Sequence, residues 1–281
     1  MKNFLIIMSV FLINLQTSVA MNNETTIIEP ITLTNTEQRL INSRKGNYQL
    51  LSSNAIQQIQ PNQPIILTLD GNALFATGYR ELLLNQAQNQ NLADKPILWG
   101  LGYPDTTLFN ARRLNDYTPT GSAHLHELIE RQLPKPMDKK ITLVGHSLGG
   151  LFALQALSLC VKNNDCPYEQ IYIASPSLWW QDEQIVKELD NWLSLAKKNP
   201  KNLPKITLTI GGLEQTPNPH DDEKRQNLLK QRKMLDHAKW LSQKLTAYHI
   251  QHDFIIFDNL RHHETADATL KLAIQRYFDK P

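Results

Sequence analysis

The residues best suited to chemistry lie in the hexapeptide Gly-His-Ser-Leu-Gly-Gly at positions 145–150. It contains the pattern Gly-x-Ser-x-Gly, whose small residues allow a serine to occupy a strained turn between a strand and a helix. Such a turn exposes the hydroxyl of Ser147, which predicts a nucleophile that attacks a carbonyl carbon. The backbone N–H of Leu148, at the start of the helix, is expected to bind the oxyanion that this attack creates.

A serine hydroxyl is a weak nucleophile and needs a neighbouring base. In a strand–turn–helix arrangement of this kind the acid and then the histidine follow the serine along the chain, each on a loop after a later strand. The last predicted strand is followed by Asp-Asn-Leu-Arg-His-His-Glu at positions 258–264. Neighbouring side chains on an extended loop point in opposite directions, so only one of His262 and His263 can face Ser147.

The acid should follow the strand before that one. Glu214 comes a few residues after Ile210, where a predicted strand ends, and a carboxylate there is placed to orient the histidine. A surface glutamate is the alternative interpretation. Asp221 and Asp222 on the same loop, and Asp258 beside the histidines, are further candidates. The carboxylates that are placed less well are Asp70, Asp116 and Asp253.

A second oxyanion donor normally comes from the loop after an early strand. Residues 68–75 read Thr-Leu-Asp-Gly-Asn-Ala-Leu-Phe, and Gly71 permits a close approach of the backbone to a substrate. The backbone N–H of Asn72 is therefore the predicted second donor.

Metal, cofactor and nucleic-acid binding are not expected. His124 and His126 are spaced so that they point to different sides of a helix. The segment His-His-Glu at 262–264 also lacks the helical spacing of metal ligands. The chain has 29 Lys and Arg against 27 Asp and Glu, and a net charge of +2 argues against an extended nucleic-acid surface.

Alternating strands and helices must position these candidate residues. Short runs rich in branched apolar residues predict buried strands at 64–69, 97–101, 140–144, 170–173, 205–210 and 253–257. Stretches with helical periodicity predict helices at 75–88, 123–133, 148–160, 182–197, 223–248 and 266–278. The alternation predicts an α/β fold with a mostly parallel central sheet and helices on both faces. Function is then expected at the carboxyl ends of the strands.

The predicted helix at 223–248 is apolar on one side and basic on the rest. Its basic residues are Lys224, Arg225, Lys230, Arg232 and Lys233. A solvated helix face is the simplest interpretation of this basic cluster.

Residues 1–20 have the features of a secretory signal peptide. Lys2 is followed by a mostly apolar run at 4–15 and by small residues up to Ala20, where cleavage is expected. The alternative, an uncleaved anchor, is disfavoured because the apolar run is short for a bilayer span. We therefore expect a periplasmic or secreted protein in which residues 21–281 form a single domain with no membrane span.

The chain contains two cysteines, Cys160 and Cys166, separated by a polar stretch. In an oxidising compartment they would form a disulfide across a short loop, worth about 2 kcal/mol of stability. Two separate structural thiols are the alternative.

Several segments occur in the order of a known family. They lie at 69–72, 102–103, 113–119, 145–150, 174–177 and 211–215. Together they resemble the esterase D-like branch of the α/β-hydrolases over about residues 45–279. Within that branch they look most like the esterases that open catecholate siderophores such as enterobactin, salmochelin and bacillibactin. Asp-Tyr-Thr-Pro at 116–119 and Ser-Pro-Ser at 175–177 are more specific to this branch than the serine pattern, which all α/β-hydrolases share.

The resemblance implies the α/β-hydrolase fold and hydrolysis of the ester bonds of a cyclic trilactone. It also implies an arginine just before Asp-Tyr-Thr-Pro, a position that Arg113 occupies, and a cation there suits anionic catecholates and their ferric complexes. An ion pair between Arg113 and Asp116 is the alternative, and Arg112 is the less favoured neighbour. Trp179 and Trp180 are expected either to form an aromatic wall against catechol rings or to pack in the core or a lid.

The resemblance also selects between the two histidines. The family segment Asn-Leu-x-His matches residues 259–262 without a gap, which assigns His262 as the base and His263 to the rim of the site. This chain departs from the family in that its histidine is followed by a second histidine and not by glycine. Some periplasmic members are described as relying on a Ser-His dyad, in which case Glu214 would not take part.

These observations favour a serine ester hydrolase acting on a catecholate siderophore, with or without iron, or on a related ester. Its partner would be that small-molecule ester, and its role iron acquisition. An acyltransferase or a general carboxylesterase on the same scaffold requires the same nucleophile and base and remains an alternative. A non-catalytic protein that captures ferric siderophore is an alternative of another class.

Overall fold

The computed structural model describes residues 37–53, 63–76, 96–105, 107–134, 141–163, 166–198 and 203–278. The predicted signal peptide at 1–20 and most of the predicted helix at 75–88 lie outside the described residues.

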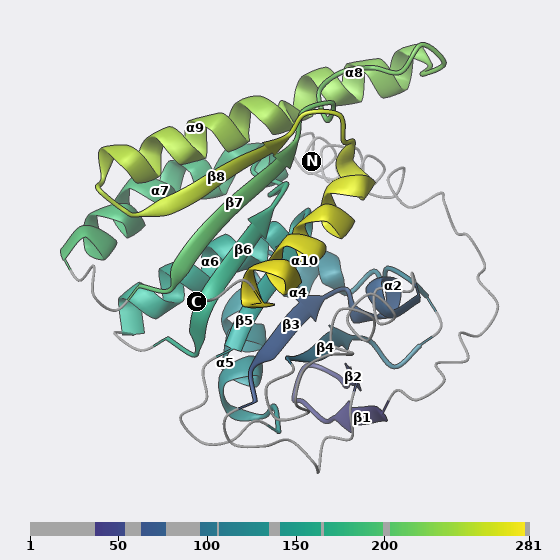
Figure 1. The fold of residues 1–281 in the computed structure, drawn as a ribbon, viewed down its shortest axis with the longest axis vertical. Helices are drawn as coiled ribbons and strands as arrows, with labels where there is room; N and C mark the ends of the chain where they lie inside the picture. Colours follow the sequence, from purple (N-terminus) through teal and green to yellow (C-terminus); the bar gives the residue numbers. More distant parts are fainter. Residues whose placement is uncertain are drawn as a thin grey trace, which may run out of the picture. The chain divides into compact units, whose positions relative to one another are not determined.

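A single eight-stranded sheet in the order β1-β2-β4-β3-β5-β6-β7-β8 organises the described residues (Figure 1). The strands are β1 (Glu37–Ile41), β2 (Tyr48–Ser52), β3 (Ile65–Leu69), β4 (Ile97–Gly102), β5 (Ile141–His146), β6 (Tyr168–Ala174), β7 (Lys205–Gly211) and β8 (His252–Phe257). Only the pairings of β1 with β2 and of β2 with β4 are antiparallel. The predicted α/β fold with a mostly parallel sheet is confirmed, and so are all the predicted strands, with small shifts of their ends.

Helices cover both faces of this sheet. They are α2 (Gly71–Ala76), α4 (Arg113–Asp116), α5 (Ser122–Arg131), α6 (Leu148–Asn163), α7 (Trp180–Lys198), α8 (Glu223–Arg232), α9 (Met234–Ala247) and α10 (His262–Phe278). Residues of α5, α6, α7 and α9 build the main apolar core against one face. On the other face, α10 packs Leu270, Ala273 and Ile274 against Ile66 and Val144, and Figure 1 shows this helix in yellow across the sheet.

The predicted helix at 223–248 is in fact two helices. Lys233 adopts a left-handed conformation, with φ of 46°, and ends α8 before α9 begins. No glycine or proline marks this break, which explains why periodicity alone misplaced it. Because α8 buries only Leu229, it makes little contact with the core, and Figure 1 shows it extending beyond the sheet.

The last helix begins earlier than predicted, at His262. Its start is stabilised by Glu264, whose carboxylate accepts a hydrogen bond from the backbone N–H of Arg261 at 2.6 Å. His262 and His263 therefore occupy the first turn of a helix and not an extended loop. Neighbouring side chains on a helix point about 100° apart, so the two histidines differ in direction, and that only one of them faces Ser147 stays a prediction.

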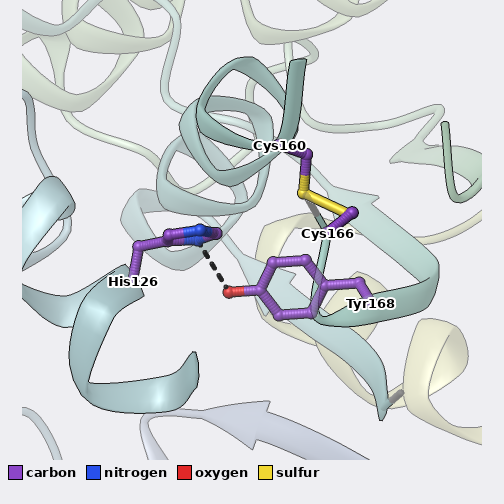
Figure 2. Close-up of a disulfide and its surroundings, with 4 residues drawn as sticks. All are labelled: His126, Cys160, Cys166 and Tyr168. Atoms are coloured by element: carbon purple, nitrogen blue, oxygen red, sulfur yellow. Dashed lines mark hydrogen bonds between the residues drawn. A yellow bond between two sulfur atoms is a disulfide. The ribbon is translucent and has the colours of Figure 1, made fainter. Parts of the chain in front are cut away.

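A disulfide between Cys160 and Cys166 joins the end of α6 to the segment before β6 (Figure 2). Because the two sulfur atoms are bonded, the alternative of two separate thiols is wrong for this structure. Both cysteines are buried in the main core. Beside the disulfide, the Tyr168 hydroxyl lies 3.2 Å from Nδ1 of His126. Within the described ranges, no helix has the length and apolar character needed to cross a membrane.

Candidate active site

Ser147 occupies a strained turn between β5 and α6, as the sequence pattern predicts. Its φ is +59°, a value that few residues other than glycine adopt. The backbone holds this conformation, since the N–H of Ser147 donates to the carbonyl of Ala174 at 3.0 Å. A side chain at Gly145 would place its Cβ 2.1 Å from the carbonyl oxygen of Gly149, so the turn requires glycine there. The hydroxyl is thus presented at the carboxyl end of β5.

His262 contacts Glu214 directly. Nδ1 of the histidine lies 2.6 Å from Oε2 of the carboxylate, whose side chain is completely buried. The other oxygen accepts hydrogen bonds from the Ser175 hydroxyl, from the N–H of Gly211 at 2.9 Å and from Thr265 at 2.9 Å. Burial raises the pKa of Glu214, but the hydrogen bonds from His262, Ser175 and Gly211 lower it by more, so the net shift is downward. Glu214 is therefore held as a carboxylate that orients the imidazole.

Five of the other carboxylates considered have partners elsewhere. Asp221 accepts from the N–H of Asn218, and Asp222 caps α8. The remaining pairings are Asp70 with Arg113, Asp116 with the hydroxyls of Tyr48 and Tyr103, and Asp253 with Arg276. Among these, only Glu214 is hydrogen-bonded to His262 in the described part of the chain.

The Ser-Pro-Ser segment at 175–177 connects the acid to the nucleophile, a role that sequence reasoning did not assign. The Ser175 hydroxyl donates to Glu214, while the Ser177 hydroxyl lies 3.3 Å from the hydroxyl of Ser147. The N–H of Ser177 also donates to the carbonyl of Ser147 at 3.1 Å. The position of this motif directly after β6 was the signal that could have indicated such a role.

His146, the residue before the nucleophile, packs against His262 with 4.5 Å between ring centroids. Its Nε2 is buried and has no hydrogen-bond partner among the described residues. Burial, and then the charges of His262 and His263, hold the pKa of His146 well below its usual value. His146 is thus a neutral neighbour of His262, whereas His263 is exposed and meets His262 edge-on.

The two predicted oxyanion donors come from neighbouring parallel strands. Leu148 is the first residue of α6 after β5, and Asn72 lies in the first turn of α2 after β3. A Cβ on Gly149 would lie 3.9 Å from Oδ2 of Asp70, so the turn after β3 lies against the first turn of α6. The Asn72 amide is committed to the backbone of Tyr103, donating at 2.9 Å and accepting at 3.0 Å. Its backbone N–H stays the predicted donor.

Arg113 forms an ion pair, but with a partner other than the expected Asp116. Its Nε and Nη2 donate to the two carboxylate oxygens of Asp70 at 2.9 and 2.7 Å. Burial lowers the pKa of Arg113, but Asp70 raises it by more. Asp116 is instead surrounded by the hydroxyls of Tyr48 and Tyr103. Arg113 and Asp116 are the first and last residues of the short helix α4, which was not predicted. They therefore have different partners and do not pair with each other.

Arg112 is tied to the backbone, since its Nη1 donates to the carbonyl of Asn47 at 2.7 Å. Its guanidinium lies over the rings of Tyr48 and Tyr103. The structure therefore gives Arg112 a role in packing, in keeping with its lower rank as a substrate ligand.

The two tryptophans are half-buried and pack on the core. Trp180 begins α7 and contacts the main core, while Trp179 packs on the cluster of Ile210, Met234 and Ala238. Arg232, expected on a solvated face, lies instead with its guanidinium 4.7 Å above the Trp179 ring. The packing interpretation is thus observed for both tryptophans, and contact with substrate stays a prediction.

This combination of a parallel sheet, a strained serine after β5 and a histidine–glutamate pair after β8 and β7 defines a serine hydrolase of the α/β-hydrolase fold. Residues 58–259 match the model of the Esterase family, whose description reads "Putative esterase". The chain belongs to this family of esterases, which act on carboxylic ester bonds.

Curated relatives share about a third of the aligned residues. The ferri-bacillibactin esterase BesA of Bacillus subtilis is 32% identical over 215 residues, which cover 66% of this chain and 72% of the relative. The siderophore triacetylfusarinine C esterase of Aspergillus fumigatus is 30% identical over 220 residues, covering 69% of this chain and 73% of the relative.

Solved structures share the fold. The siderophore hydrolase EstA from Aspergillus nidulans superposes with a TM-score of 0.75 at 24% identity, covering 89% of this chain and 97% of the other. The BES protein from Bacillus cereus superposes with a TM-score of 0.68 at 26% identity, with the same coverage.

Proposed function

We propose that this chain hydrolyses the ester bonds of a catecholate siderophore through Ser147, His262 and Glu214. The observation that carries the proposal is the 2.6 Å contact between Nδ1 of His262 and the fully buried Glu214 carboxylate. It fixes one imidazole nitrogen as a donor and leaves Nε2 as the base. Relatives named as ferri-bacillibactin and enterobactin esterases support the choice of substrate.

The proposed reaction uses each of these groups in turn. Nε2 of His262 takes the proton of the Ser147 hydroxyl as its oxygen attacks the ester carbonyl. The N–H groups of Leu148 and Asn72 bind the oxyanion of the tetrahedral intermediate. The C–O bond to the alcohol then breaks, and His262 returns its proton to that oxygen. A water molecule hydrolyses the acyl-enzyme by the same steps and releases the acid.

The experiment combines covalent labelling with product analysis. A fluorophosphonate should add once, on the peptide that contains Ser147, and Ser147→Ala should abolish labelling. The wild type should convert enterobactin, iron-free or ferric, to linear and monomeric products seen by mass spectrometry, and Ser147→Ala should lower turnover by several orders of magnitude. Ester cleavage retained by folded Ser147→Ala would overturn the proposal.

Two outcomes would select the alternatives. Transfer of the acyl group to an added alcohol in preference to water would indicate an acyltransferase. A folded protein that binds ferric siderophore but forms no fluorophosphonate adduct would indicate a binding protein.

We also propose that the chain is exported to the periplasm or secreted, after cleavage following Ala20. The basic and apolar pattern of residues 1–20 and the Cys160–Cys166 disulfide support this, because disulfides persist in oxidising compartments. The intact mass of the protein isolated from its native cells should correspond to a chain that begins at Met21 and carries the disulfide. A mass that includes residues 1–20 would contradict the proposal.

A further inference from the structure

Arg232 is a cation with no carboxylate partner among the described residues. Its Nε is buried without a hydrogen bond, and no ion pair or hydrogen bond joins its side chain to another side chain that the structure describes. Its charged neighbour is another cation, Arg225, and burial followed by that repulsion lowers the pKa of Arg232 to about 10. An arginine that is partly removed from water without a counter-ion is unfavourable unless a ligand supplies one.

The Trp179 ring holds this guanidinium in place. The guanidinium carbon lies 4.7 Å from the ring centroid, a cation–π geometry. Trp179 is itself fixed by packing on Ile210, Met234 and Ala238. Trp179 therefore positions the guanidinium of Arg232, and that guanidinium is the group of the pair that can contact a ligand.

This pair lies at the catalytic edge of the sheet. Trp179 follows Ser177 by two residues, and the Ser177 hydroxyl lies 3.3 Å from that of Ser147. Two Cα–Cα steps span at most about 7.6 Å, so the backbone of Trp179 is close to the reactive serine. Ile210, against which Trp179 packs, is one residue from Gly211, whose N–H donates to Glu214.

We propose that Arg232, positioned by Trp179, forms an anion-binding subsite for the aromatic acyl part of the substrate. A planar guanidinium matches the paired oxygens of a catecholate and carries the charge that an anionic ring requires. The proposal rests on the proposed ester hydrolysis and adds the residue that selects anionic over neutral acyl groups.

The test measures charge selectivity with substrates that share one leaving group. These are the para-nitrophenyl esters of benzoic acid, which is neutral, and of terephthalic acid, whose second carboxylate is free. The selectivity ratio is kcat/KM for the anionic ester divided by kcat/KM for the neutral ester. Arg232→Gln should lower this ratio about tenfold, mainly through KM, because one charge-assisted contact is lost.

Arg225→Gln is the matched control, because it removes the same charge from an exposed position on the same helix. It should leave the ratio unchanged. Arg232→Lys, which keeps the charge and loses the planar fork, should give an intermediate ratio. Added salt should lower the ratio of the wild type more than that of Arg232→Gln.

Two results would overturn the subsite. The first is an unchanged ratio in Arg232→Gln, which includes an equal loss of kcat/KM on both esters, and the second is the same fall of the ratio in Arg225→Gln. The failure of the proposed substrate is separate: a wild type that cleaves the nitrophenyl esters but not enterobactin would reject the catecholate trilactone while the ratio still tests the subsite.

Discussion

Two arginines, one before Ser147 in the chain and one after it, have different surroundings. Arg113, after β4, is joined through two hydrogen bonds to Asp70, and its charge is compensated. Arg232, at the end of α8, lies against Trp179, with no carboxylate partner in the described part of the chain. The family resemblance made Arg113 the candidate for binding an anionic substrate, but Arg113 and Asp70 together form a neutral ion pair. A free positive charge is found where a solvated helix face was expected.

The same contrast separates the two half-buried histidines of the site. His262 is hydrogen-bonded to Glu214, whereas His146, only 4.5 Å away between ring centroids, has an unpartnered Nε2. The basic side chains of this region therefore fall into two groups. Those with a carboxylate partner are held in place, and those without one can respond to a ligand or to a change of pH.

The largest effect is expected from Asp70→Asn. This change removes the counter-ion of Arg113 while keeping the shape of the side chain, and it should lower the free energy of unfolding by about 2–4 kcal/mol, because both side chains are mostly buried. Urea unfolding measures it. In Asp70→Asn/Arg113→Gln the loss should be smaller than the sum of the two single losses. Additive losses would show that the pair is not coupled.

A smaller effect is expected from acid, and it distinguishes His146 from its paired neighbour. His146 is neutral in the folded protein, whereas in the unfolded chain it binds a proton near pH 6.5. Stability should therefore fall as the pH drops below about 6.5, and His146→Asn should reduce that loss. Folding lowers the pKa of Glu214, so its contribution to the free energy of unfolding is present above pH 4.5 and is lost only below that pH. An unchanged slope between pH 6.5 and 4.5 in His146→Asn would contradict this assignment.

The smallest effect is expected from Arg232→Gln on stability. Loss of the contact with Trp179 is offset by removal of an uncompensated buried charge, so the free energy of unfolding should stay within about 1 kcal/mol of wild type. Thermal and urea unfolding measure this difference in the free energy of unfolding between Arg232→Gln and the wild type. A loss as large as that of Asp70→Asn would mean that Arg232 has a counter-ion and that the two arginines do not differ.

The sequence predicted the strands that carry the site because β3 to β7 are buried almost throughout and read as continuous apolar runs. It predicted neither β2 nor the edge strand β1, where only Ile41 is buried. An exposed edge strand with polar residues has no pattern that separates it from a loop.

The site shows the same limit. Ser147 was placed by a local pattern, since the strained turn needs small residues close in sequence. The partners of Arg113 and Arg232 depend on residues far apart in the chain. Asp70 precedes Arg113 by a strand and a connection, and Trp179 is separated from Arg232 by α7 and β7. No spacing rule reports such contacts, so the charge balance of each arginine had to come from the tertiary structure.

The break at Lys233 bears on how this scaffold can diversify. It separates α9, which is part of the core, from α8, which buries a single leucine. Mutations, insertions or deletions in α8 are expected to leave the sheet and the Ser147–His262–Glu214 arrangement intact. They would change the side chain that packs on Trp179, which is Arg232 in this chain. Substrate preference can thus drift through one weakly constrained helix, and related enzymes that share the catalytic residues are expected to differ most in this segment.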